Sequence, residues 1–149
     1  MSIDHTYLMT LIEMSRYDKA QTLFDTYDID EISDELVWHA FDHETDILYQ
    51  FVCYLIEQKE TVKLHDLAIE LSMHPFCHLD GAYFRAYDHF QRTVALTHRQ
   101  DVACLEYLLF LAEVPDQVTL KQEALAVANE IILLEPKNQI AKDFLKGMK

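Results

Sequence analysis

A chain of 149 residues, half of them apolar, is long enough to bury a core without disulfides or structural metals, and this composition excludes a disordered chain. Only two glycines and three prolines occur, which argues against a turn-rich β protein, and no segment is apolar enough to predict a signal peptide or a membrane span. The formal net charge of −14 at pH 7 argues against nucleic acids and anionic membranes as partners and favours a basic protein.

These properties predict a single domain over residues 1–149 that lies in the cytoplasm. The chain has three cysteines, Cys53, Cys77 and Cys104, and each lies in a helix-like context. An odd number of cysteines in such contexts fits a reducing compartment better than a disulfide framework. The oligomeric state is not indicated by any of these features.

Apolar residues recur at helical spacing along the chain, which predicts an all-α fold of about nine helices in antiparallel pairs. Asp4, Ser33 and Thr61 stand where N-caps of the first, third and fifth helices are expected, with residues 28–35 as an acidic connector. Residues 119–122 have the sequence of a capping box for the eighth helix. The expected helices cover residues 4–14, 17–27, 47–58, 61–73, 101–113 and 138–146, with a third that ends at Phe41, a sixth that follows Asp80 and an eighth that ends before Pro136.

The expected fourth helix, residues 47–58, is apolar on nearly every side. Such a helix is usually central in its fold, because neighbouring elements cover it from several directions. We expect Tyr49 within it to pack between helices.

Two segments 66 residues apart share one spacing of small and aromatic residues. Alanine in this pattern lets two helices approach, and the aromatic side chain fills the groove between them. The segments are Ser15-x-Tyr17-x-x-Ala20-x-x-x-Phe24 and Gly81-x-Tyr83-x-x-Ala86-x-x-x-Phe90, and a third segment with Ala124 continues the series to Pro136 and Asn138.

This pattern resembles the tetratricopeptide repeat and covers most of the chain. The resemblance implies helix pairs stacked in a short superhelical array with a concave surface that holds another protein. The repeat is degenerate, because Ser15 replaces the turn glycine, His98 stands where proline is usual, and residues 30–73 match only weakly.

A second resemblance concerns the segments LVWHAFDHETDILYQFVCYLIE and HPFCHLDGAYFRAYDHF. They resemble small proteins of Bacillus-like bacteria, some of which are encoded near secreted polymorphic toxins as immunity proteins. This resemblance implies an intracellular protein that neutralises a toxin.

Acidic residues gather in the first third of the chain. Residues 1–60 hold fourteen Asp and Glu against three basic residues, and no Lys or Arg lies between Lys19 and Lys59. A solvated acidic face is one explanation, and a docking surface for a basic protein is the other. Trp38 would be an anchor of that surface if it is exposed, and a packing residue if it is buried. The predicted partner-binding residues are Asp28, Asp30, Glu31, Asp34, Glu35, Trp38, Asp42, Glu44 and Asp46.

His74, Cys77 and His78 form the one cluster with ligand-type side chains. A structural zinc site needs four ligands, and no second Cys/His pair with suitable spacing exists. We therefore expect a corner between helices here and no metal or cofactor. A metal site, or a Cys77 nucleophile paired with a histidine that Asp80 orients, is the alternative.

The sequence thus predicts a non-enzymatic protein-binding module, in its specific form an immunity protein that neutralises a basic toxin through the acidic surface. A repeat-type scaffold or co-chaperone that holds a peptide in its groove is one alternative. An enzyme or metal site at residues 74–78 is the other.

Overall fold

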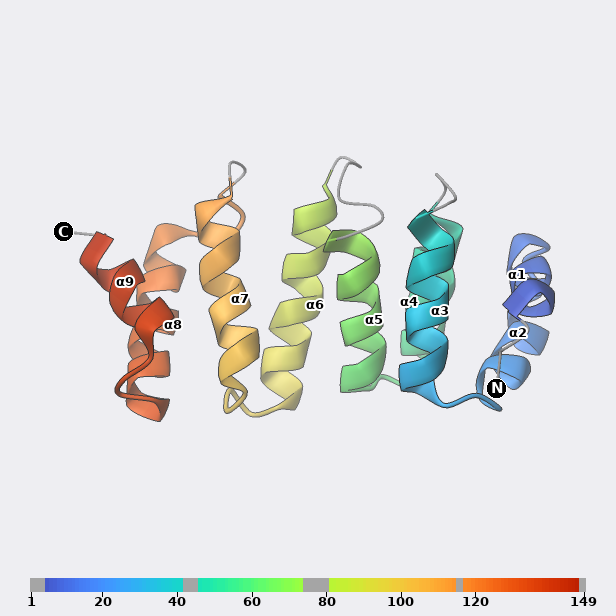
Figure 1. The fold of residues 1–149 in the computed structure, drawn as a ribbon, viewed down its shortest axis with the longest axis horizontal. Helices are drawn as coiled ribbons and strands as arrows, with labels where there is room; N and C mark the ends of the chain where they lie inside the picture. The colour runs from blue at the N-terminus through green and yellow to red at the C-terminus, as the bar shows by residue number, and fades with distance from the viewer. Residues whose placement is uncertain (1–4, 42–45, 74–80, 115–116, 148–149) are drawn as a thin grey trace. The chain divides into compact units, whose positions relative to one another are not determined.

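The computed structural model describes residues 5–41, 46–73, 81–114 and 117–147. Every regular element in these ranges is an α-helix, so the prediction of an all-α fold with about nine helices is confirmed (Figure 1). None of these helices is long and apolar enough to cross a membrane. They are α1 (His5–Glu13), α2 (Tyr17–Phe24), α3 (Ile29–Phe41), α4 (Ile47–Gln58), α5 (Val62–Met73), α6 (Ala82–Leu96), α7 (Val102–Glu113), α8 (Lys121–Leu134) and α9 (Gln139–Gly147).

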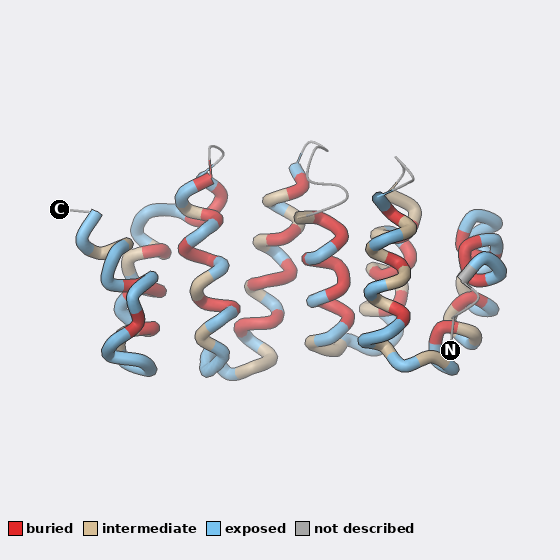
Figure 2. The backbone as a smooth tube through the Cα atoms, viewed as in Figure 1, coloured by how far each residue is buried: buried red, intermediate tan, exposed pale blue. Residues whose placement is uncertain are grey.

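The chain forms two compact units, Met1–Ala82 and Tyr83–Lys149. The first unit holds α1 to α5, and the second holds α7 to α9 together with all of α6 except its first residue. Each unit has buried apolar residues of its own, which form stripes along its helices (Figure 2). The single domain over residues 1–149 stays a prediction.

In the first unit α4 is the central helix, as its sequence predicts. It packs against α1, α2 and α5, while α3 packs against α5. Leu48, Phe51, Val52 and Leu55 of α4 are buried, and Tyr49 is partly buried against the same core, as expected. Burying each such aliphatic or aromatic side chain stabilises a fold by about 1.5–3 kcal/mol, so α4 contributes much of the unit's stability.

The residues of the first repeat segment join α2 to α4. The Tyr17 ring lies 5.5 Å from the Phe51 ring and 5.1 Å from the Tyr54 ring, measured between centroids. Phe24 contacts Phe51 edge-on at 6.1 Å, and Ala20 between them is fully buried. The small residue thus lets the helix approach while the two aromatic rings fill the space on either side.

The second segment packs in the same way in the second unit. Tyr83 meets the Phe110 ring of α7 at 6.4 Å, Phe90 stacks on Tyr107 at 4.9 Å, and Ala86 is fully buried. The shared spacing of the two segments therefore corresponds to a shared packing role, in which one helix places two aromatic rings against a later helix.

The backbone at the start of both segments also matches. Gly81 has φ of +80°, and Ser15, at the equivalent position, has φ of +57°. Ser15 ends α1 in a Schellman motif, in which the Ser15 N–H donates to Ile12 at 3.0 Å and the Arg16 N–H donates to Leu11 at 2.8 Å. The turn therefore needs a left-handed residue in both copies, although only one copy carries glycine.

Polar bonds hold α6 to α8 in the second unit. The Tyr87 hydroxyl donates to Glu123 at 2.6 Å, and the Gln91 amide donates to the same carboxylate. Arg99, which follows the end of α6, makes a bidentate pair of hydrogen bonds to the Glu130 carboxylate at 2.8 and 2.7 Å. The helices α7, α8 and α9 of this unit all pack on one another.

The third repeat segment lies in α8 and the turn that follows it. Ala124 is fully buried, and α8 ends at Leu134, before Pro136, as predicted. Asn138 then caps α9, because its side-chain oxygen accepts from the Ala141 N–H at 2.8 Å. The Asn138 amide also donates to Glu106 at 2.8 Å, which ties the start of α9 to α7.

The predicted start of the third helix is wrong. The helix α3 begins at Ile29, so most of the expected acidic connector is helical and Ser33 lies inside the helix. Asp28 acts as the cap instead, since its carboxylate accepts from the N–H groups of Asp30 at 2.9 Å and Glu31 at 3.2 Å. The cap that the sequence predicts at Thr61 is confirmed, because its hydroxyl accepts from the Leu64 N–H at 3.2 Å. Asp4 lies outside the described residues.

The predicted capping box at residues 119–122 is also wrong. The helix α8 begins at Lys121, and the residue before it, Leu120, makes no side-chain cap bond. Thr119 is buried with 1% of its surface exposed, and its hydroxyl has no hydrogen-bond partner among the residues that the structure describes. Thr119 thus lies one residue before the observed N-cap position, and its side chain is buried in the apolar interior instead of capping α8.

Candidate protein-docking site

The local sequence of α3 explains how an acidic segment forms a helix. Asp28 caps the first turn, and Asp30 and Glu31 lie beside the positive end of the helix dipole, which stabilises both the carboxylates and the helix. Ile32 and Leu36 on the opposite side are fully buried. The apolar side therefore fixes the helix on its unit and leaves the acidic side in water.

The exposed side of α3 carries one stripe of four residues, here called the α3 face: Asp30, Asp34, Trp38 and Phe41. Their spacing of i, i+4, i+8 and i+11 places them on one side of the helix. Trp38 is 72% exposed and Phe41 is 56% exposed, and their rings lie 6.2 Å apart. Trp38 is thus exposed, which is the condition under which the sequence predicts an anchor residue.

A hollow of about 200 Å³, here called the acidic groove, lies between α3 and α5 beside this face. Asp30 and Asp34 line it from α3, and Asp66 and Glu70 line it from α5. Lys63 is the one basic residue among its lining. Four carboxylates against one ammonium group give the groove a negative potential that favours cationic groups.

The ion pair between Lys63 and Asp30 sets the charge at one end of the groove. The Lys63 ammonium lies 2.9 Å from the Asp30 carboxylate, and both side chains are largely exposed. The hydrogen bond to Asp30 and the charges of Asp30, Asp28 and Asp66 raise the pKa of Lys63, so this group stays protonated at neutral pH. The excess negative charge of the groove therefore lies toward Asp34, Asp66 and Glu70.

The structure brings together only part of the predicted partner surface. Asp30, Glu31, Asp34 and Trp38 are exposed on α3, and Glu35 is partly buried. Asp46 precedes α4, where its carboxylate accepts from the Gln50 amide at 2.8 Å. Asp28 is exposed but acts as the cap of α3, while Asp42 and Glu44 lie outside the described residues.

The α5 residues of the groove, and Phe41 at its edge, were not predicted from the sequence. Asp66 and Glu70 come from α5, more than thirty residues after Asp34, and Phe41 was not among the predicted partner-binding residues. A helical spacing of i, i+3 and i+7 for Lys63, Asp66 and Glu70 was present as a signal. This spacing could not assign the three residues to the groove without the knowledge that α3 packs on α5.

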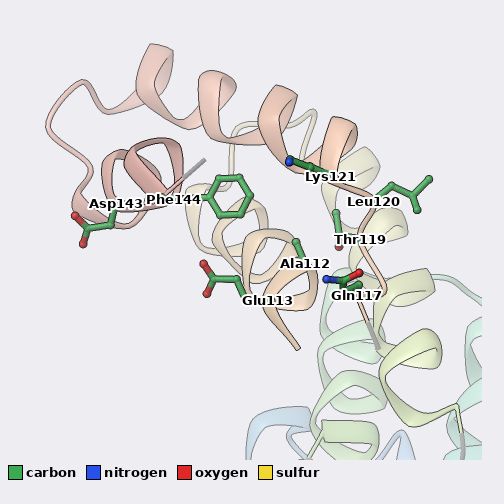
Figure 3. Close-up of a pocket in the computed structure, with 9 residues that line it drawn as sticks. Ala112, Glu113, Gln117, Thr119, Leu120, Lys121, Asp143 and Phe144 are labelled. Atoms are coloured by element: carbon green, nitrogen blue, oxygen red, sulfur yellow. The ribbon is translucent and has the colours of Figure 1, made fainter. Parts of the chain in front are cut away.

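A different hollow lies in the second unit, where α7 ends, α8 begins and α9 passes (Figure 3). Its volume is about 390 Å³, and its lining mixes both charges with apolar groups. Glu113 and Asp143 supply carboxylates, Lys121 supplies an ammonium group, and Phe144 and the buried Thr119 also line it. This mixed lining favours no single class of ligand.

Within the described residues no three His, Cys, Asp or Glu side chains are arranged to hold a metal ion. The residues of the proposed ligand cluster, His74, Cys77 and His78, lie outside the described part of the chain, and so does Asp80. The alternative of a metal site or an enzyme at residues 74–78 therefore stays untested.

The described residues thus form an all-helical protein with an acidic groove and an exposed aromatic pair on one helix. Comparison with models of known families, with curated proteins and with solved structures finds no significant match for this chain.

Proposed function

We propose that the chain is a protein-binding module that docks a basic protein on the α3 face and the acidic groove. The observation that carries the proposal is the exposed pair of Trp38 and Phe41 at the end of an acidic stripe. Tryptophan and other large aromatic residues dominate binding hot spots, and an exposed aromatic cluster has no role in the packing of its own unit.

The chemistry of the α3 face fits a partner with exposed lysine or arginine. Asp34, Asp66 and Glu70 attract cationic side chains into the groove, which raises the association rate and selects against acidic proteins. The Trp38 ring offers apolar contact area and a face for a cation. The carboxylates would thus set the association rate and the specificity, while the aromatic pair would slow the dissociation of the complex.

The specific form of the proposal is an immunity protein that acts in the cytoplasm and neutralises a basic toxin. The resemblance of residues 36–57 to such proteins supports it, as does the large acidic surplus of the first third of the chain. In this form binding blocks the toxin, and the chain needs no catalytic group of its own.

The proposal is tested by capturing the partner from lysate and culture medium of the native cell with three immobilised proteins. They are the wild type, a Trp38→Ala variant with Asp34→Lys, and a control with Glu13→Lys and Glu57→Lys. The control residues are exposed in the last turns of α1 and α4. We expect a basic protein on the wild type and the control, and its loss from the Trp38→Ala variant.

The immunity form has its own readout. The captured protein, produced alone in a bacterial culture, should arrest growth, and co-production of the wild-type chain should restore growth. Retention of the partner by the variant with an altered α3 face would contradict docking on that face and favour the scaffold alternative. A captured protein that leaves growth unchanged would contradict the immunity form alone.

A further inference from the structure

The helix α7 has apolar side chains on two sides, of which one is fully buried and the other is only partly covered. Leu105, Leu108 and Leu111 are fully buried in the second unit. On the other side Tyr107 is 47% exposed and Phe110 is 43% exposed. Phe90 of α6 stacks on the Tyr107 ring and Tyr83 contacts the Phe110 ring, so α6 covers this side of α7 only in part.

The partly covered side of α7 forms one wall of a hollow of about 460 Å³, here called the α7–α9 groove. Tyr107 and Phe110 line it from α7, and Ile140 and Phe144 line it from α9. Ile140 is 50% exposed. Both walls are helical. The spacing of i and i+3 for Tyr107 and Phe110, and of i and i+4 for Ile140 and Phe144, gives each wall a row of apolar side chains along the groove.

Two carboxylates stand along this groove, Glu106 and Glu113. They are seven residues apart, so they lie on one side of α7 at a separation of about 10 Å along the helix. Glu106 accepts one hydrogen bond from the neutral Asn138 amide at 2.8 Å. For Glu113, no hydrogen bond or ion pair is present among the described residues, although Lys121 lines the adjoining hollow that Glu113 shares.

We infer that the α7–α9 groove binds a cationic amphipathic helix of a protein partner. The apolar side of that helix packs on Tyr107, Phe110 and Ile140, and its basic residues, two turns apart, pair with Glu106 and Glu113. A helix fits because both walls are helices and a partner alongside α7 repeats the same axial spacing. A second copy of this chain is disfavoured, because each copy carries a net charge of −14.

This groove belongs to the second unit, whereas the proposed docking surface on α3 belongs to the first. The inference therefore goes beyond the proposed function and does not depend on it. It assigns the chain a second binding surface with a partner of defined chemistry.

The test uses two labelled model peptides and fluorescence anisotropy with the full chain. Both are amphipathic helices of about 14 residues with the same leucine face, one with lysines two turns apart and the other with glutamates in their place. We expect the cationic peptide to bind at least about tenfold more tightly than the anionic one. Replacing Glu113→Lys or Ile140→Gln should weaken that binding by about fivefold or more.

Matched variants keep the experiment specific. Leu133→Gln removes an exposed apolar residue of α8 outside the groove, and Asp88→Lys reverses an exposed charge of α6 outside the groove. Glu13→Lys with Glu57→Lys reverses charge at exposed positions of the first unit outside the α3 face and the acidic groove. All three should leave the affinity within about twofold, since none of these residues contacts the groove.

Three outcomes would overturn the inference. The first is equal binding of the two peptides or binding of neither, and the second is a control variant that weakens binding as much as Glu113→Lys does. The third is a concentration-dependent dimer, seen by analytical ultracentrifugation, that Ile140→Gln abolishes, because a second copy would then occupy the groove.

Discussion

Ser15 is a non-glycine residue held in a left-handed conformation. Its φ of +57° satisfies the Schellman motif that ends α1, and its side chain is exposed. An L-residue with a side chain is strained in this region by roughly 1 kcal/mol relative to glycine. We expect Ser15→Gly to raise the free energy of unfolding by about 0.5–1 kcal/mol, measured by chemical denaturation.

The equivalent turn residue Gly81 serves as the opposite control. A Cβ atom at Gly81 would meet nothing within 4 Å, so Gly81→Ala introduces backbone strain and no clash. This variant should lose about 1 kcal/mol. Equal effects of the same sign at the two positions would contradict the shared turn.

The Thr119 hydroxyl is buried and has no partner within the described part of the chain, which is costly because a hydroxyl loses its bonds to water on burial. We expect Thr119→Val, which keeps the shape of the side chain, to stabilise the second unit by about 1 kcal/mol. Thermal and chemical denaturation measure the difference.

Thr93 is the matched control for Thr119. It is equally buried, but its hydroxyl donates to the His89 carbonyl at 2.9 Å. Thr93→Val should therefore lose about 0.5–1 kcal/mol. Destabilisation by Thr119→Val as large as that by Thr93→Val would show that the Thr119 hydroxyl has a partner after all.

At the scale of single residues, the sequence predicts packing roles better than caps. The roles of Ala20, Ala86 and Phe90 follow from spacing alone, and the structure confirms them. A cap depends on the single residue at which the chain turns into the helix, as the case of Thr119 shows. A shift of one position there places the side chain in the interior and away from the helix start.

The element α3 depends on Asp28 for its start. We expect Asp28→Ala to cost about 1 kcal/mol in the free energy of unfolding, since two N–H groups lose their acceptor. Ser33, which the sequence pattern suggested as the cap, lies in the second turn. Ser33→Ala should change the stability by less than about 0.5 kcal/mol, and the reverse order of the two effects would contradict the observed helix start.

The contact between α6 and α8 should depend on pH. Burial and the hydrogen bond to Glu123 raise the pKa of Tyr87 above its ordinary value. The protonated hydroxyl is the donor, so its contribution is complete below a pH of about 10 and is lost as the pH rises through the raised pKa.

We therefore expect wild type to exceed Tyr87→Phe by about 1 kcal/mol in unfolding free energy at pH 8 and by less at more alkaline pH. Tyr83→Phe is the control, because the Tyr83 hydroxyl makes no hydrogen bond among the described residues. It should change the stability at pH 8 by less than about 0.5 kcal/mol. A Tyr87 contribution that grows with pH would contradict the donor role of its hydroxyl.

Elements were predictable to different degrees for a physical reason. The helix α4 was placed and assigned a central position from its apolar residues, because these decide its contacts. The first turns of α3 were predicted as a connector, since acidic residues are common in loops. The spacing of Ile29, Ile32 and Leu36 carries the helical period there, and it outweighs the acidic composition.

At the scale of the whole molecule, the charge distribution of the sequence predicted one part of the acidic groove. The acidic surplus was assigned to the first third of the chain, and Asp30 and Asp34 do line one groove. The contribution of α5 was not foreseen, because helix pairing depends on tertiary packing. In the first unit α3 packs on α5 and α4 on α1 and α2, a pairing that local periodicity does not specify.

The proposed function requires electrostatic attraction to act over the whole acidic surface. Attraction between exposed charges weakens as salt shortens the Debye length, from about 14 Å at 50 mM to about 6 Å at 300 mM. A basic partner should therefore associate with the wild type more slowly at high salt. The dissociation rate should change little with salt, because it depends on the apolar contacts of Trp38 and Phe41.

The most direct test is the association rate constant of the captured partner, measured by stopped flow at low and high salt. The three proteins compared are the wild type, Glu31→Lys with Asp34→Lys, and Glu13→Lys with Glu57→Lys. The two variants change the net charge equally, at exposed positions on α3 in one and on α1 and α4 in the other. The account predicts that reversal on α3 slows association about tenfold at low salt and abolishes most of the salt dependence, whereas the control stays within about twofold to threefold of the wild type. Equal rates for the two variants, or a wild-type rate indifferent to salt, would contradict it.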